Sequence, residues 1–165
     1  MMKHVLTLLA IFAGLTFVAC NSNVDDIPAP DQRFQPTEAI LQAFSNYFPT
    51  AENIRWQQAE RNALADFQDK GVETQAVFNP AAELLLMREF ITEEELPQPA
   101  IEYLNTYYSV FPITSVIREV DFTIGKGEVI YLVEYGVKDR GGLAKFDAEG
   151  NFLDCEDYEG HDCEG

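Results

Sequence analysis

LQAFSNYFPTAENIR, at residues 41–55, returns as LNTYYSVFPITSVIR at residues 104–118. The leucine, the Phe-Pro pair and the Ile-Arg pair occupy the same places in both copies. In each copy, apolar residues recur at helical spacing up to the proline, which cannot continue a helix. An extended pattern follows the proline. The repeat therefore predicts a chain built from two copies of one unit, each beginning with an amphipathic helix.

Four strand patterns follow each of these helices, and short turn sequences separate them. Such alternating, β-branched and aromatic stretches are typical of antiparallel sheets. We therefore predict an α+β fold: a tandem repeat of a helix plus a four-stranded antiparallel sheet, with the helices packed on one face of the sheets. The strands are expected at residues 53–60, 64–68, 73–78 and 83–91, and again at 116–124, 128–137, 142–147 and 151–155.

Composition divides the chain into five parts. The glutamate run that ends at Glu95, followed by Leu96-Pro97, separates the two repeats. A proline-containing polar stretch before the first helix is typical of a linker. The expected parts are a signal peptide at 1–19, a flexible linker at 20–35, the first repeat at 36–95, the second repeat at 96–155 and an acidic tail at 156–165.

Strand phase separates a helix-covered face from an open face. In the strand at 128–137, valines and tyrosines alternate with a mixed set of residues, and we assign the valine and tyrosine face to the core. The phase of the preceding strand places Ile117 on the open face and Arg118 inward. Because this Ile-Arg pair is repeated, either a bulge resets the register or Ile117 lies under the helix end. The open face then carries Ile117, Glu119, Asp121, Ile130, Leu132 and Glu134.

The N-terminal residues resemble an export signal. Lys3 precedes an apolar run that ends at Ala19-Cys20, and this run is too short for a membrane span, which needs about 20 apolar residues. The sequence Phe17-Val18-Ala19-Cys20 resembles a bacterial lipobox, in which Cys20 is acylated and anchors the protein. We expect a lipid-anchored protein of the bacterial envelope, in the outer membrane; the alternative is an ordinary signal peptide that ends near a cysteine.

The chain is strongly acidic, with 28 Asp and Glu against 11 Lys and Arg and a formal net charge of −17. This charge argues against nucleic acid, whose phosphates it would repel. It argues equally against unaided binding to anionic lipid. Basic protein partners and divalent cations remain compatible with it, as does a simple role in solubility.

Catalytic patterns are missing from the sequence. Beyond the signal segment the only histidine is His161, close to the end of the tail, whereas a nucleophilic site needs a histidine held beside its nucleophile. Neither a phosphate-binding glycine loop nor a zinc-type cysteine pair occurs. We expect no enzyme activity, no cofactor and no resident metal.

Two cysteines flank the acidic tail. In an oxidising compartment, a disulfide between Cys155 and Cys163 is the simple interpretation. A soft-metal site formed by Cys155, His161 and Cys163 is the alternative.

Several aromatic and turn residues carry a resemblance to a known protein family, and this resemblance covers residues 36–154. They are Phe48-Pro49 with Trp56, Phe78-Asn79, Leu96-Pro97, Phe111-Pro112, Tyr131, Tyr135 and the run 146–150. The pattern resembles the PepSY-like, beta-lactamase-inhibitor-like (BLIP-like) family of exported Bacteroidetes proteins. The resemblance implies a non-enzymatic module that clamps a partner's loop on its sheet or restrains a peptidase. It carries over no contact residue.

The resulting hypothesis is an exported lipoprotein that binds or inhibits an unknown envelope or extracellular protein through its open sheet face. Membrane contact would be through the lipid anchor alone, and no nucleic acid is expected. The candidate contact residues are Trp56, Ile117, Glu119, Asp121, Ile130, Leu132 and Glu134. Trp56 is better explained as a core or core-edge aromatic beside the first helix. The alternative function is binding of a cation or small ligand by an acidic groove and the Cys/His tail.

Overall fold

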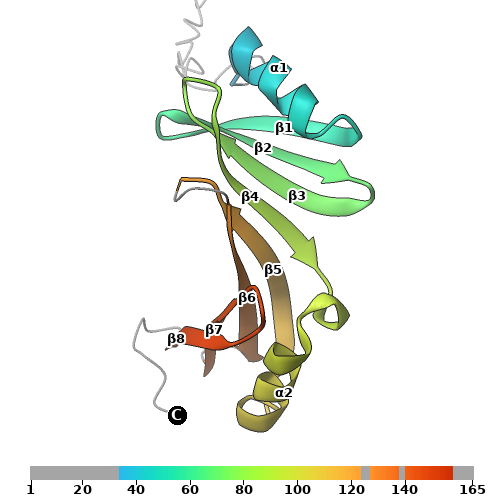
Figure 1. The fold of residues 1–165 in the computed structure, drawn as a ribbon, viewed down its shortest axis with the longest axis vertical. Coiled ribbons are helices and arrows are strands. Elements are labelled where there is room, and N and C mark those ends of the chain that lie inside the picture. The colour runs from blue at the N-terminus through green and yellow to red at the C-terminus, as the bar shows by residue number, and fades with distance from the viewer. Residues whose placement is uncertain (1–33, 124–126, 138–139, 158–165) are drawn as a thin grey trace, which may run out of the picture. The chain divides into compact units, whose positions relative to one another are not determined.

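The computed structural model describes residues 34–123, 127–137 and 140–157. These residues belong to one compact unit (Figure 1). No helix within the described residues is long and apolar enough to cross a membrane. The elements in chain order are α1 (Glu38–Tyr47), β1 (Ala51–Ala59), β2 (Asn62–Asp69), β3 (Val72–Phe78), β4 (Leu84–Ile91), the short 3-10 helix η1 (Glu93–Glu95), α2 (Gln98–Tyr107), β5 (Ile113–Asp121), β6 (Glu128–Val137), β7 (Arg140–Asp147) and β8 (Phe152–Asp157).

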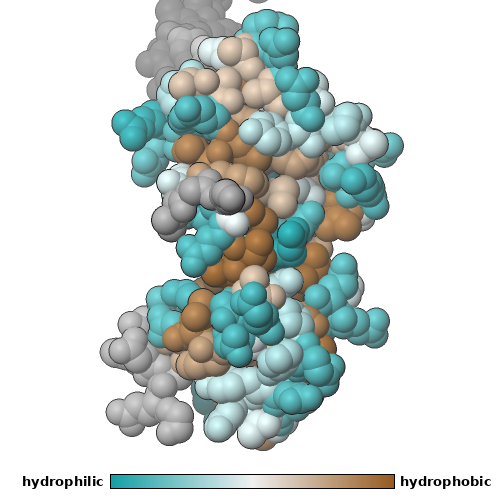
Figure 2. Space-filling model, in the orientation of Figure 1, coloured by the Kyte–Doolittle hydropathy of each residue, from teal (hydrophilic) through white to brown (hydrophobic). Residues whose placement is uncertain are grey.

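All eight strands form a single antiparallel sheet in the order β1 to β8. The prediction of two four-stranded sheets is therefore wrong. β4 pairs with β5 in continuous register from Leu86 opposite Asp121 to Ile91 opposite Val116. This pairing satisfies the backbone groups of two strands that would otherwise be exposed sheet edges. Figure 2 shows hydrophobic side chains continuing across the middle of the unit, over β4 and β5.

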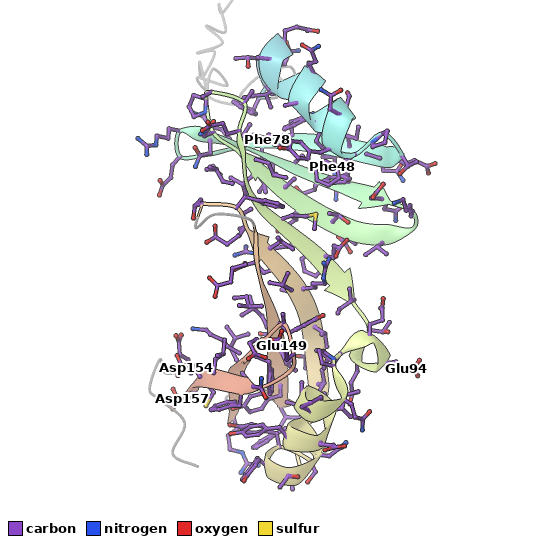
Figure 3. All side chains as sticks on the ribbon, in the orientation of Figure 1. Phe48, Phe78, Glu94, Glu149, Asp154 and Asp157 are labelled. Atoms are coloured by element: carbon purple, nitrogen blue, oxygen red, sulfur yellow. The ribbon has the colours of Figure 1, made fainter. Side chains whose placement is uncertain are left out.

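Helix α1 covers the first part of the sheet. The Thr37 hydroxyl accepts a hydrogen bond from the backbone N–H of Ile40 at 3.4 Å and caps the helix. Ile40 and Phe44 are buried, as is Phe48 just after the helix. Figure 3 shows Phe48 and Phe78 together beneath α1. Leu41 and Tyr47, which are also apolar residues of α1, are 37% and 56% exposed.

Helix α2 packs on the second part of the same sheet and on the same side. Leu104 lies in a core cluster with Val133, Tyr135 and Phe146. Val133 and Tyr135 of the predicted valine and tyrosine face of β6 are therefore buried, whereas Val137 at the end of the strand is 45% exposed. The two core clusters share no buried member. The two halves nevertheless exchange side chains at the pairing of β4 with β5. Phe122, just after β5, packs on the first cluster, and Ile91, at the end of β4, packs on the second.

The two repeated Ile-Arg pairs lie differently in the sheet because β1 contains a β-bulge at the first of them. In β1 the register shifts just before Arg55, where Asn53 has a positive φ of 56°. Asparagine adopts this conformation more readily than most residues. Ile54 lies within the shift and is 43% exposed. As a result, Arg55 lies on the side without helices and Arg118 on the side with them; β5 has its own shift nearer its start.

Candidate interaction surface

The side of the sheet opposite the helices forms one continuous surface, which we call the helix-free face. Strand pairing defines it, because directly paired residues point to the same side. No residue of this face belongs to either core cluster or packs against one. The side chains considered below are Arg55, Gln57, Leu64, Asp66, Gln75, Val77, Leu86, Arg88, Phe90, Ile117, Glu119, Asp121, Glu128, Ile130, Leu132, Glu134, Leu143, Lys145, Asp154 and Glu156.

Half-buried apolar side chains make two rows across this face. Phe90, Ile117 and Leu132 lie directly opposite one another on β4, β5 and β6. A second row on β2, β3 and β4 consists of Leu64, Val77 and Leu86. All six side chains are only partly covered, although they lie on interior strands of the sheet. On β7 the first row ends at Lys145, opposite Leu132, while Ile130 on β6 and Leu143 on β7 lie in the neighbouring rows on either side of it.

A line of polar contacts runs between the two apolar rows. Asp66 accepts hydrogen bonds from the side-chain amides of Gln57 and Gln75, at 2.6 and 2.8 Å. Farther along, Arg88 Nε lies 2.6 Å from Glu119 Oε2 across the pairing of β4 with β5. Because both charges of this pair are satisfied, they order the centre of the face without adding net charge.

Carboxylates dominate the part of the face near β6 to β8. Lys145 lies 2.9 Å from a Glu156 oxygen and 3.9 Å from an Asp154 oxygen. The hydrogen bond to Glu156 is the main cause that raises the pKa of Lys145, so this cation is engaged by its neighbours. Asp121 accepts hydrogen bonds from the N–H and hydroxyl of Thr123. No described cation forms an ion pair with Asp121 or Glu134.

The structure brings six of the seven candidate contact residues onto this face. Trp56 is the exception: it lies on the helix-covered side, with its ring centroid 5.2 Å from that of Phe44, and packs on the first core cluster. Its place as a core aromatic follows from the bulge, which turns Arg55 outward and Trp56 inward. Whether the six remaining residues contact a partner stays a prediction.

Sequence reasoning missed the contribution of β4. Phe90 and Leu86 carry one end of each apolar row, and Arg88 forms the central ion pair. The alternation in the stretch LLLMREFI is hidden because both faces of β4 are largely apolar. The repeated Arg-Glu pair could have revealed which strand lies next to β4. In antiparallel register Arg88 meets Glu119 and Arg118 meets Glu89, which gives one ion pair on each face of the sheet.

The tail is only partly described. Cys155 is buried and disulfide-bonded, and the Tyr108 hydroxyl donates a hydrogen bond to its sulfur at 3.4 Å. Burial is the main cause that raises the pKa of Tyr108 to about 12. Cys163, His161 and the lipidation candidate Cys20 lie outside the described residues, so the predicted pairing, metal ligands and anchor stay predictions. Within the described ranges, no group of three His, Cys, Asp or Glu side chains could hold a metal ion.

Comparison with known proteins identifies the fold. No protein-family model and no curated protein matches the chain. Among solved structures, a BLIP-like protein from Bacteroides fragilis aligns with a TM-score of 0.68 and 20% identity, covering 81% of this chain and 94% of that one. The chain has the BLIP-like fold.

Two further solved structures with a similar fold come from the same genus. A proposed periplasmic protein from Bacteroides eggerthii aligns with a TM-score of 0.68 and 20% identity, covering 75% of this chain and 90% of that one. A DUF2874 family protein from Bacteroides ovatus aligns with a TM-score of 0.67 and 16% identity, covering 75% and 89%. At these identities the likeness concerns the fold. The BLIP-like resemblance is thus confirmed for the fold, and its PepSY-like part stays a prediction.

Proposed function

We propose that this chain is a non-enzymatic exported protein that binds another protein of the bacterial envelope through its helix-free face. The observation that carries the proposal is the one-sided placement of both helices. It leaves interior strands with two rows of half-buried aliphatic and aromatic side chains outside the core clusters. Contiguous apolar surface with a polar rim is characteristic of protein interaction sites.

The location is part of the same proposal. One of the solved structures with this fold is described as that of a proposed periplasmic protein, which supports export of this chain. The sequence Phe17-Val18-Ala19-Cys20 adds a candidate lipid anchor in the outer membrane. Acylation would hold the sheet near other envelope proteins, where binding would restrain or inhibit the bound protein.

Site-specific photo-crosslinking in the native envelope tests the binding face. A crosslinking amino acid at Ile117 or Glu134 samples the helix-free face, and one at Gln42, exposed on α1, is the matched control on the other side. We expect discrete crosslinked protein bands from the first two positions and none of the same bands from Gln42. Equal bands from all three positions, or none from Ile117 and Glu134, would show that this face is not the binding site.

A further inference from the structure

We infer that the partner presents a cationic segment with an aliphatic or aromatic centre, which seats on the β4 to β7 part of the helix-free face. This inference rests on the proposed function and adds the chemistry of the partner. The row Phe90, Ile117, Leu132 crosses two interstrand spacings, roughly 10 Å. That width fits one extended or looped segment lying across the strands.

The centre of the surface is apolar and therefore selects apolar side chains of the partner. Ile130 lies beside Leu132 on the same face of β6, and Leu143 lies on β7 opposite Glu134. None of these side chains is in either core cluster, so each retains surface that a partner can remove from water. Burial of such surface favours association with a partner.

The rim of the surface selects the partner's charge. Around this apolar centre the described cations are Arg88 and Lys145, and both are engaged by neighbouring carboxylates. Charged groups at the rim set the orientation and speed of binding more than the final affinity. The carboxylates that surround the centre are Glu119, Asp121, Glu128, Glu134, Asp154 and Glu156.

This charge distribution disfavours the other occupants of an apolar sheet face. A second copy would place the same carboxylates against one another, because a two-fold interface apposes identical patches. An anionic lipid surface would be repelled for the same reason. A cationic protein segment is the occupant that both the centre and the rim accept.

Panning a displayed library of random peptides against the purified full-length protein tests the inference. We expect the enriched peptides to carry lysine or arginine around an apolar centre. Leu132→Asp should weaken their binding about tenfold, although it adds negative charge. Glu134→Lys should weaken it several-fold, whereas Glu60→Lys, the same charge change in the exposed β1–β2 turn, should leave it unchanged. Thermal melting checks each variant, and Leu132→Asn replaces the aspartate variant if that one does not fold.

The outcomes separate this inference from the proposed function. Neutral or acidic peptides that lose binding with Leu132→Asp would overturn the cationic partner and leave the binding face standing. Unspecific charge attraction would overturn the inference. It would be revealed by peptides that bind Leu132→Asp more tightly than the wild type and that lose as much affinity with Glu60→Lys as with Glu134→Lys. Failure to enrich any peptide would also overturn the inference. So would a dimer in sedimentation that Leu132→Asp dissociates, because the occupant would then be a second copy.

Discussion

Gly150, in the β7–β8 turn, packs closely against the beginning of α2. Its φ is +87°, which L side chains rarely adopt, and a Cβ built there would lie 2.7 Å from Pro97 Cβ and 3.0 Å from the backbone nitrogen of Ala100. The glycine is therefore required twice, once for the turn and once for the close approach of the helix. The sequence showed the turn, but the contact with α2 is tertiary and left no local pattern.

We expect Gly150→Ala to lower the free energy of unfolding by roughly 2–4 kcal/mol, from backbone strain plus overpacking against Pro97. Gly71→Ala is the matched control, because Gly71 has a φ of +86° but nothing within 4 Å of a built Cβ. It should cost only about 1 kcal/mol. Urea denaturation of both variants measures the difference. Equal losses would mean that the contact with α2 contributes nothing.

At the scale of elements, the turns after β3 and β7 are built alike around one side chain. Asn79 Oδ1 accepts hydrogen bonds from the backbone N–H groups of Ala81 and Glu83. Asp147 Oδ1 does the same for Glu149 and Asn151. Phe78-Asn79 and Phe146-Asp147 therefore occupy equivalent places in the two turns. Of the two side chains that organise these turns, Asp147 can be protonated by acid and Asn79 cannot.

The hydrogen bond from the Asn151 side chain is the main cause that lowers the pKa of Asp147. Since the folded state holds this proton less tightly than the unfolded state, the stabilisation is present above the unfolded pKa of about 4. It is lost as pH falls through the lower folded value. Stability of the wild type should thus begin to decline as the pH falls below about 5.

Asp147→Asn tests this dependence, because asparagine keeps an oxygen acceptor for the turn and does not titrate. Urea midpoints from pH 6 to pH 3 should fall less steeply for the variant than for the wild type. Asp69→Asn, a carboxylate at the β2–β3 turn that receives a hydrogen bond from Thr50, is the control for removing one acid near a turn. Parallel curves for wild type and Asp147→Asn would contradict the assignment.

Strand phase was predictable where one face is buried, and less so where both faces are apolar. Alternation in β6 assigned the core side correctly and placed Ile130, Leu132 and Glu134 on the helix-free face. The side of Trp56 was not predictable, because it depends on the bulge at Asn53, and one extra residue reverses every side chain after it. Local patterns report the period of a strand and carry little information about irregularities in its pairing.

At the scale of the whole molecule, the repeat suggested two sheets, and the pairing of β4 with β5 makes one. This pairing joins strands separated in the chain by η1 and α2, and it spans the predicted boundary between the repeats at Leu96-Pro97. Leu96, with which the predicted second repeat begins, is buried in the second core cluster. Pairing between distant strands is set by complementary faces and charges, such as Arg118 with Glu89, and no local pattern contains it.

A continuous sheet should unfold as one cooperative unit, although it has two core clusters. The backbone ladder between β4 and β5 couples the clusters, and Phe122 and Ile91 extend that coupling through side chains. Trp56 is the only tryptophan and reports the first cluster, whereas Tyr108 and Tyr135 lie in the second. Urea transitions followed by tryptophan fluorescence and by tyrosine absorbance should therefore coincide.

Phe44→Leu in the first cluster and Phe146→Leu in the second make this a reciprocal test. Each should lower the free energy of unfolding by roughly 1–2 kcal/mol and move both signals by the same amount, because loss of either cluster exposes the shared β4–β5 pairing. If Phe44→Leu moved only the tryptophan signal and Phe146→Leu only the tyrosine signal, the halves would fold independently. A shared sheet would then be a geometric continuity without energetic coupling, and contacts on the helix-free face across β4 and β5 would depend on two separate folding equilibria.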